Sequence, residues 1–185
     1  EHQRILQSVT DRTVTAVRNQ GGLLPAEVAG KGVLVTGWNG TFDNIGTLAA
    51  RLAERGARTT ALPTGQPSDA VIAQAVAAAA SHDLVVVQTN QALADPAARQ
   101  LRLVRALAAT GKPVVLVAVR DPYELAHLTE VPAQLATFST VPAAMAALAK
   151  VITGEVSPRG RLPVAVPAAG SPSTVLYPYG HGLSW

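Results

Sequence analysis

The 185-residue sequence contains no cysteine, which excludes disulfide bonds, thiolate nucleophiles and zinc sites with cysteine ligands. Charged residues make up 15% of the chain, aromatic residues 4%, and the net charge is +3. The basic residues are scattered and few aromatic side chains could stack on bases, so we expect no nucleic-acid partner. No apolar run approaches the ~18 residues that span a bilayer, so we expect no membrane segment.

Motifs for metals, nucleotides and serine nucleophiles are missing as well. The four histidines stand at neither H-x-x-x-H nor H-E-x-x-H spacing, so we predict no metal site. The turn Gly37-Trp38-Asn39-Gly40 lacks the G-x-G-x-x-G spacing, and we expect a tight turn whose helix is capped by Asp43 or by Asn44. No cofactor is implied. Localisation stays open, although a secreted or cell-surface bacterial parent protein fits the sequence.

Short apolar runs alternate with helical patterns along most of the chain. Five runs predict strands, at residues 32–36, 58–62, 84–88, 113–119 and 134–138. The helices expected between them span residues 44–54, 68–81, 96–109 and 141–152. Strand–helix–strand repeats predict a parallel sheet with helices on both faces. We therefore predict the α/β class: a three-layer α/β/α sandwich with a mostly parallel, doubly wound sheet of about six strands and a flavodoxin-like appearance.

The two ends of the chain are expected to complete this sandwich. Apolar residues at helical spacing predict an opening helix, with Ile5, Leu6, Val9, Val14 and Val17 on one face. Residues 162–166 are expected to add a sixth strand at one edge, and the proline-rich residues 167–178 to wrap the surface. We predict one domain over 1–185, with an entry helix and strap (1–30), a βα core (31–153) and a closing strand with C-terminal wrap (154–185). Because the helical pattern begins at once, we expect the native protein to extend upstream.

Ligands of doubly wound sheets bind outside the carboxyl ends of the strands. The candidate ligand-binding residues at these ends are Trp38, Asn39, Asn90, Arg120, Asp121 and Tyr123. The rings of Trp38 and Tyr123 suit stacking on a sugar, although burial at the edge would explain them equally well. Asp121 and Glu124 could form an acid pair. We favour the alternative, in which Asp121 caps a short helix and Pro122 is its first residue.

Three arginines, Arg99, Arg102 and Arg105, share one face of a predicted helix. We expect a solvated face, with contact to an acidic partner domain as the alternative.

Residues 153–185, TGEVSPRGRLPVAVPAAGSPSTVLYPYGHGLSW, resemble the end of the second domain of glycoside hydrolase family 3 enzymes. Residues 11–19, the Leu-Leu-Pro at 23–25 and residues 31–37 resemble the first helix, strap and first strand of that domain. The resemblance implies that the nucleophile lies in a preceding barrel domain of the same polypeptide. That barrel would be the partner of this chain, with a β-linked amino-sugar substrate at the shared cleft. His181 is then better explained as part of a C-terminal strap than as a catalytic residue.

One loop separates the branches of this family. In the β-glucosidase branch the loop after the third strand supplies an acid/base glutamate, but residues 88–96 contain no glutamate here. Residues 119–125, Val-Arg-Asp-Pro-Tyr-Glu-Leu, resemble instead the R-(N/D)-P-Y-D-L stretch of the two-domain β-N-acetylhexosaminidase branch. In that branch both catalytic groups belong to the barrel.

The resemblance thus implies a chain with no catalytic residue, inactive alone, whose parent hydrolyses terminal β-linked N-acetylglucosamine by a retaining route. Two alternatives stay open: a part of a β-N-acetylglucosaminide phosphorylase, and a stand-alone carbohydrate-binding or protein-interaction domain.

Overall fold

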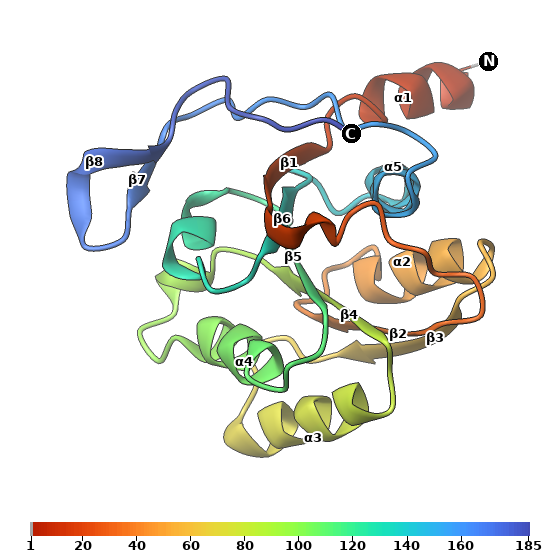
Figure 1. The fold of residues 1–185 in the computed structure, drawn as a ribbon, viewed down its shortest axis with the longest axis horizontal. Coiled ribbons are helices and arrows are strands. Elements are labelled where there is room, and N and C mark those ends of the chain that lie inside the picture. The colour runs from red at the N-terminus through yellow and green to blue at the C-terminus, as the bar shows by residue number, and fades with distance from the viewer. Residues whose placement is uncertain (1) are drawn as a thin grey trace.

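The computed structural model describes residues 2–185, with side chains from residue 4 onward. Its main sheet has six strands: β1 (Thr15–Asn19), β2 (Gly32–Gly37), β3 (Arg58–Pro63), β4 (Leu84–Thr89), β5 (Val114–Ala118) and β6 (Ala133–Ala136). The spatial order is β1-β6-β5-β4-β2-β3 (Figure 1). The five strands β2 to β6 are parallel, in the flavodoxin-like order, and β1 pairs antiparallel with β6. The predicted fold class is confirmed.

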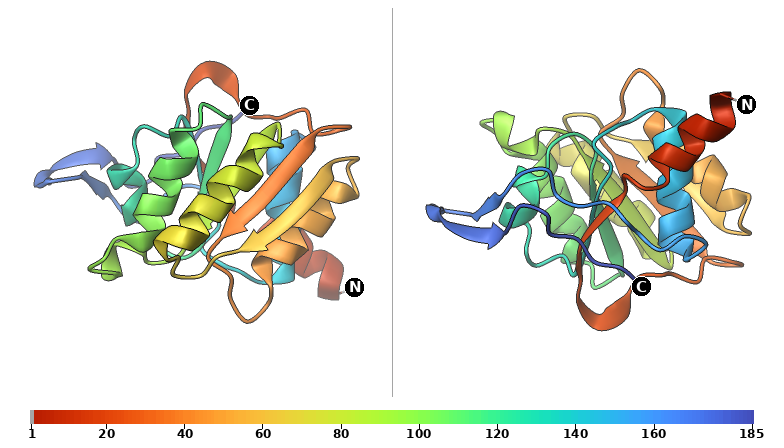
Figure 2. Two further views of the ribbon diagram at one scale, coloured as in Figure 1. Left: turned by 90° about the horizontal axis from the view of Figure 1, so that it is seen from below. Right: turned by 90° about the horizontal axis from the view of Figure 1, so that it is seen from above.

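Helices cover both faces of the sheet, as predicted. They are α1 (His2–Thr10), α2 (Asn44–Ala53), α3 (Asp69–Ala80), α4 (Arg99–Ala108) and α5 (Pro142–Thr153), with short 3₁₀ helices η1 (Gln20–Gly22), η2 (Ala92–Ala94) and η3 (Tyr123–His127). The two views in Figure 2 show α3 and α4 on one face and α2 and α5 on the other. The first helix packs on the outside of α5. Among the described helices, none has the length and apolarity needed to cross a membrane.

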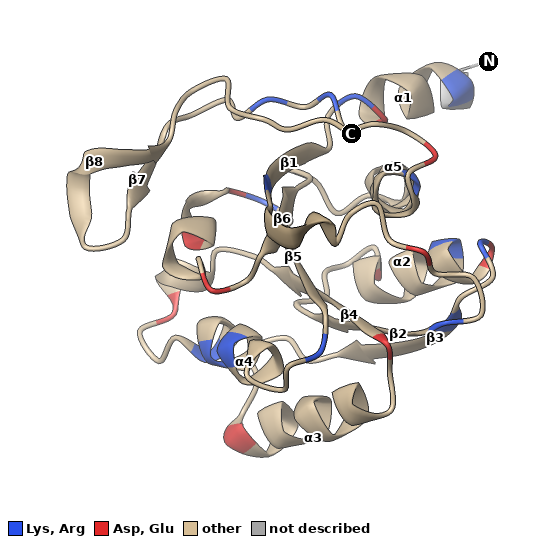
Figure 3. Ribbon diagram, viewed as in Figure 1, with Lys and Arg blue, Asp and Glu red and all other residues tan. Residues whose placement is uncertain are grey.

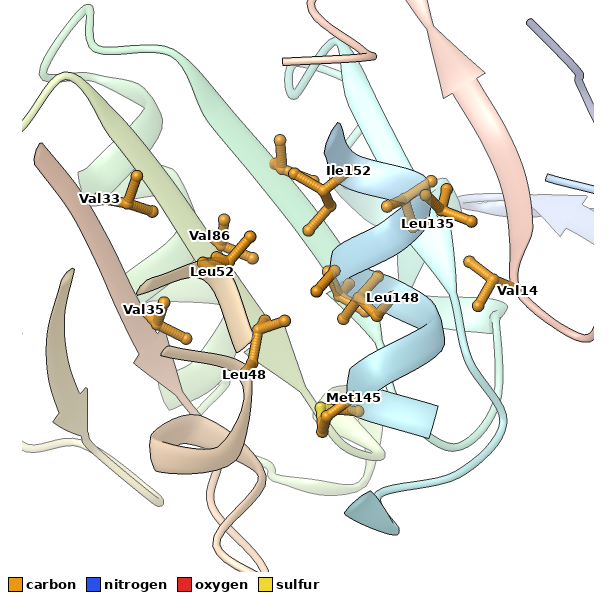
Figure 4. Close-up of a cluster of buried hydrophobic side chains, with 14 of the residues drawn as sticks. Val14, Val33, Val35, Leu48, Leu52, Val86, Leu135, Met145, Leu148 and Ile152 are labelled. Carbon is orange, nitrogen blue, oxygen red and sulfur yellow. The ribbon is translucent and has the colours of Figure 1, made fainter. Parts of the chain in front are cut away.

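The core divides into two layers, one on each side of the sheet. Alternate side chains of β2 point to opposite faces, so Val33 and Val35 pack toward α2 and α5 while Leu34 packs toward α3 and α4. Figure 4 shows the first layer, where Leu48 of α2 and Leu148 of α5 meet the strand valines. Every residue of β4 and β5 is buried, which explains why these two strands read as continuous apolar runs.

The edge strand β1 departs from the sequence prediction. A helix was expected through Val17, but α1 ends at Thr10 and the chain is extended from Thr15. Val14 and Ala16 are buried on one side of the sheet and Val17 on the other. Only an extended segment of the sheet places residues this close in sequence on its opposite faces. The burial of these side chains therefore favours a strand, despite their helical spacing. The sixth strand is therefore β1, and the prediction of a sheet strand at residues 162–166 is wrong.

The C-terminal tail lies along the free edge of β1. Gly160 N donates to Val14 O at 3.0 Å and Leu183 N donates to Ala16 O at 2.8 Å. His181 Nε2 lies 2.8 Å from Val17 O, and its ring stacks on Tyr177 with centroids 5.2 Å apart. A side chain at Gly160 would collide with the carbonyls of Thr13 and Val14, just before β1, and with the side chain of Thr15. The tail thus satisfies backbone groups that an edge strand would leave open, and His181 serves this strap, as predicted.

Part of the tail forms a hairpin instead of wrapping the surface. Strands β7 (Val166–Ala168) and β8 (Ser171–Tyr177) pair antiparallel and project from one end of the molecule (Figure 1). Residues 162–185 contain no Asp, Glu, Lys or Arg, so the hairpin is uniformly tan in Figure 3. Because this hairpin projects from the molecule, the expectation that residues 167–178 wrap the surface is wrong.

Candidate functional site

The switch point of the sheet lies between β2 and β4, where the strand order reverses and doubly wound folds open their binding crevice. Gly37 ends β2 with a φ of 106°, and a Cβ there would collide with the backbone of Gln88 in β4. Trp38 N donates to Gln88 O at 2.8 Å directly after it. Glycine therefore lets the turn after β2 rest on β4, and this contact positions Trp38 over the switch point.

A buried asparagine holds this turn from below. Asn44 Nδ2 donates to Trp38 O at 2.9 Å and to Gln88 Oε1 at 2.8 Å, while Asn44 Oδ1 accepts from Gly40 N at 2.7 Å. Asp43 caps α2 by accepting from Gly46 N, so the predicted cap is confirmed. The amide of Asn39 is also engaged inside the turn, with Ile45 N and Asp43. These hydrogen bonds of Asn39, Asp43 and Asn44 hold the turn in place.

A hollow of about 440 Å³ lies at this carboxyl edge. It is lined by Trp38, Gln66, Asn90, Gln91, Ala94, Asp95, Pro96, Arg99 and Arg120. Three of the six residues predicted for binding, Trp38, Asn90 and Arg120, therefore come together on one hollow. The other three, Asn39, Asp121 and Tyr123, are not among the lining residues. The candidate site thus takes side chains from the ends of β2, β4 and β5.

The loop between β4 and α4 forms the largest part of the wall of the hollow. The buried side chain of Gln100 anchors its start, since Oε1 accepts from Asn90 N and Nε2 donates to Asn90 O, both at 2.9 Å. Gln91 and Ala98 have φ of 48° and 51°, the left-handed region that costs non-glycine residues energy. The sequence did not reveal this anchor, because a glutamine in the first turn of a helix is usually solvated.

Asp95 closes the same loop and fixes the start of α4. Its carboxylate accepts from Ala97 N, from Arg99 N and from the Nε and Nη2 of the Arg99 side chain. The hydrogen bonds from Arg99, first of all from its side chain, lower the pKa of Asp95 to about 2. Asp95 is thus ionised at neutral pH and balances Arg99. Arg120 then leaves the hollow net positive, since no ion pair involves Arg120 within the described part of the chain.

The arginine face of α4 is exposed, as expected, but acids lie closer than the sequence indicated. Arg102 pairs with Asp69 of α3. Arg105 Nε lies 3.2 Å from Glu130 Oε1. Because the side chains of these two pairs are 44–78% exposed, the pairs add little to stability.

Glu124 lies beneath the wall of the hollow and is entirely buried. Its Oε2 accepts from Ala92 N at 3.3 Å. Burial raises the pKa of Glu124 to about 7; the hydroxyl of Thr89 opposes this rise, and the negative charge of Asp121 adds to it. Asp121 does not cap the following helix: η3 begins after Pro122 without a side-chain cap, so that prediction is wrong. The segment starts instead as a 3₁₀ turn, in which Leu125 N donates to Pro122 O at 3.2 Å and no side chain caps the helix.

Comparison with protein families matches residues 14–185 to the glycosyl hydrolase family 3 C-terminal domain. The chain belongs to this family. No curated protein matches the sequence at a significant level. Among the described residues no cluster of three metal-binding side chains occurs.

Solved family 3 enzymes share the fold. A family 3 β-N-acetylglucosaminidase from Paenibacillus sp. str. FPU-7 is 25% identical over 86% of this chain and 32% of its own length, with a TM-score of 0.75. A fungal multi-domain family 3 β-N-acetylglucosaminidase is 23% identical over 96% and 20%, with a TM-score of 0.75. A β-glucosidase from Listeria innocua is 17% identical over 97% and 33%, with a TM-score of 0.79. The family 3 domain described here therefore spans a third or less of these relatives.

Proposed function

We propose that this chain is the non-catalytic accessory domain of a family 3 β-N-acetylhexosaminidase. Its parent would hydrolyse terminal β-linked N-acetylglucosamine with catalytic groups in a preceding barrel domain. The observation that carries the proposal is the loop between β4 and α4, residues 90–98, which contains no glutamate. Its one carboxylate, Asp95, accepts four hydrogen bonds and has its pKa lowered to about 2. A general acid at neutral pH needs the opposite, a raised pKa.

Glu124 does not replace the missing acid. Its raised pKa is typical of a general acid, but its side chain has no exposed surface and lies under Ala92. A catalytic acid must come within hydrogen-bond reach of the leaving oxygen. A retaining glycosidase also needs its two carboxyl groups ~5–5.5 Å apart across the scissile bond. Both members of such a pair would therefore have to come from outside this domain.

The choice of branch rests on these two segments and not on the fold. Both β-N-acetylglucosaminidases and β-glucosidases stand among the structural relatives. The absent glutamate of residues 90–98 and the stretch at residues 119–125 favour the first group.

The test compares this chain with its full-length parent on an aryl N-acetyl-β-glucosaminide. We expect no aryl release above the blank from the chain alone and clear hydrolysis by the parent. Asp95→Asn and Glu124→Gln, placed in the parent, should each leave kcat within about threefold, since neither group takes part in the proton transfer that typically contributes 10²–10⁴-fold. Hydrolysis by the chain alone, or a loss of kcat of about a hundredfold or more in either variant, would contradict the proposal.

A second candidate function, carbohydrate binding by the chain itself, is favoured by the unengaged amides of the hollow. The side chains of Gln66, Asn90 and Gln91 make no hydrogen bond to other described residues, and the indole of Trp38 lies beside them. Planar amides and an aromatic ring are groups that recognise sugar hydroxyls and ring faces. Titration with N-acetylglucosamine oligosaccharides tests this: binding should be lost in Trp38→Ala and kept in Trp185→Phe. Absence of binding at millimolar sugar rejects this candidate without touching the first.

A further inference from the structure

Glu124 joins the two segments that follow β4 and β5. It belongs to η3, after β5, yet its Oε2 accepts from Ala92 N in η2, after β4. Its Oε1 is buried without a hydrogen-bond partner, and so is Oγ1 of Thr89, the last residue of β4. The Thr89 hydroxyl is close enough to lower the pKa of Glu124, although the two groups do not have the geometry of a hydrogen bond. A carboxyl group with one unsatisfied oxygen therefore lies directly under the loop that lines the hollow.

The two protonation states of this group make different demands on their surroundings. An ionised carboxylate only accepts hydrogen bonds, and each buried lone pair that lacks a donor costs energy. A neutral carboxylic acid has a donor of its own, which would serve Thr89 Oγ1 after a small movement. Charge also tightens the bond from Ala92 N, because hydrogen bonds to a charged acceptor are shorter and stronger. Gain or loss of one proton thus changes the forces on Thr89, just before the loop, and on Ala92 in its middle.

The charged neighbours of Glu124 are few. Of the elements that pack on η3, η2 and β7 contain no charged residue, and β6 contributes the neutral Gln134, whose Nε2 donates to Leu125 O. Asp121 lies on the same segment and disfavours ionisation. His127 ends η3, and its carbonyl accepts from Arg105. Beyond η2, Asp95 and Arg99 neutralise each other.

We propose that Glu124 is a positioning residue whose proton sets the arrangement of residues 90–95, so that the wall of the hollow responds to pH. The raised pKa of Glu124, about 7, places both protonation states near neutral pH. Because Asn90 and Gln91 lie on the responding segment, the shape that the hollow offers to a ligand changes with the same proton. This response belongs to the loop itself, whether or not the hollow binds a sugar.

Backbone amide NMR of the 185-residue chain between pH 5 and 9 tests this directly. The Ala92 amide should shift with a midpoint near pH 7, and the amides of Gln91 and Ala94 should follow with the same midpoint. In Glu124→Gln all three should stay constant. His127→Gln should keep the transition, which separates Glu124 from the nearby imidazole, and Glu130→Gln serves as a matched surface control.

A second variant keeps the test decisive if Glu124→Gln fails to fold. Asp121→Asn removes the neighbouring negative charge that disfavours ionisation, so the midpoint should fall. The proposal is overturned if the Ala92 amide does not titrate in this range, if Glu124→Gln retains the transition, if His127→Gln abolishes it, or if Asp121→Asn leaves the midpoint unchanged.

Discussion

Two carboxyl groups hold the same loop and behave in opposite ways. Asp95 ends the segment between β4 and α4, and its pKa is lowered to about 2. Glu124 supports the middle of that segment from below, and its pKa is raised to about 7. Their intrinsic pKa values differ by less than one unit. The separation of the two groups therefore comes from their surroundings.

The number of hydrogen-bond donors explains the difference. Asp95 accepts four hydrogen bonds, two of them from a guanidinium group, so its charge is compensated. Glu124 accepts one from Ala92 N and is cut off from water. Burial with one donor favours the neutral acid, whereas four donors favour the anion. At neutral pH the far end of the loop is therefore held by Asp95, which stays ionised. The middle of the loop is held by Glu124, which titrates in this range.

The largest effect is expected from Glu124→Gln, which removes the titrating group and keeps its shape. A pKa raised from 4.5 to about 7 means that the folded chain binds more protons than the unfolded chain between these pH values. The wild type should therefore lose stability as pH rises from 4.5 to 7, by about 3 kcal/mol at 1.36 kcal/mol per pKa unit. Urea unfolding at pH 5 and pH 8 should show the variant clearly more stable than the wild type at pH 8 only.

Glu130→Gln is the matched control for this comparison, because Glu130 is a surface glutamate on a neighbouring segment. It should keep the wild-type loss of stability between pH 5 and pH 8. An equal loss in Glu124→Gln would show that groups other than Glu124 cause it.

The next effect concerns the neutral anchor at the start of the loop. Gln100→Leu removes both hydrogen bonds to the backbone of Asn90 and should cost about 2 kcal/mol, since buried polar groups lose their partners. The cost should be the same at pH 5 and pH 8, because an amide does not titrate. Gln100→Glu sharpens the contrast: its ionised form cannot donate to Asn90 O, so its cost should increase with pH. Equal costs of Gln100→Glu at both pH values would count against the role assigned to Nε2.

A smaller effect is expected for Asp95→Asn. The folded-state pKa of Asp95 lies below its usual value of 3.8, so its stabilisation is complete above pH 4 and is lost as pH falls toward 2. The variant should have a lower urea midpoint than the wild type at pH 6, and the difference should shrink at pH 3. A difference that stays constant between these pH values would mean that the carboxylate charge is not what stabilises the loop.

The sequence predicted the parallel part of the sheet because burial on both faces leaves a local trace. Strands such as β4 and β5 are continuous apolar runs, and Asp43 stands where a helix cap is needed. It did not predict β1, because the burial of Val14 and Val17 on opposite faces depends on the tail that packs beside them. The division of the chain into segments at residues 30 and 153 stays a prediction.

The candidate site was predictable in position and not in chemistry. The rule for doubly wound sheets placed Trp38, Asn90 and Arg120 at one edge, and the structure brings them to one hollow. Nothing local to Glu124 distinguishes a buried carboxyl group from a solvated one in a turn. Its burial follows from η2 lying over it, a contact between residues 32 positions apart in the sequence.

The smallest effect on stability is expected at Arg99, whose side chain is the main cause of the low pKa of Asp95. In Arg99→Leu, Asp95 keeps its bonds from the backbone N–H groups of residues 97 and 99, so its pKa should rise from about 2 but stay below 3.8. Arg99→Lys retains the charge without the two-nitrogen fork and should give a smaller rise. Carboxyl ¹³C NMR of Asp95 between pH 1.5 and 5 measures both. The titration of Glu124 near pH 7 should be the same in both variants, because Arg99 is not among the groups that set its pKa. A shifted midpoint for Glu124 would show that Asp95 and Glu124 are coupled through the loop.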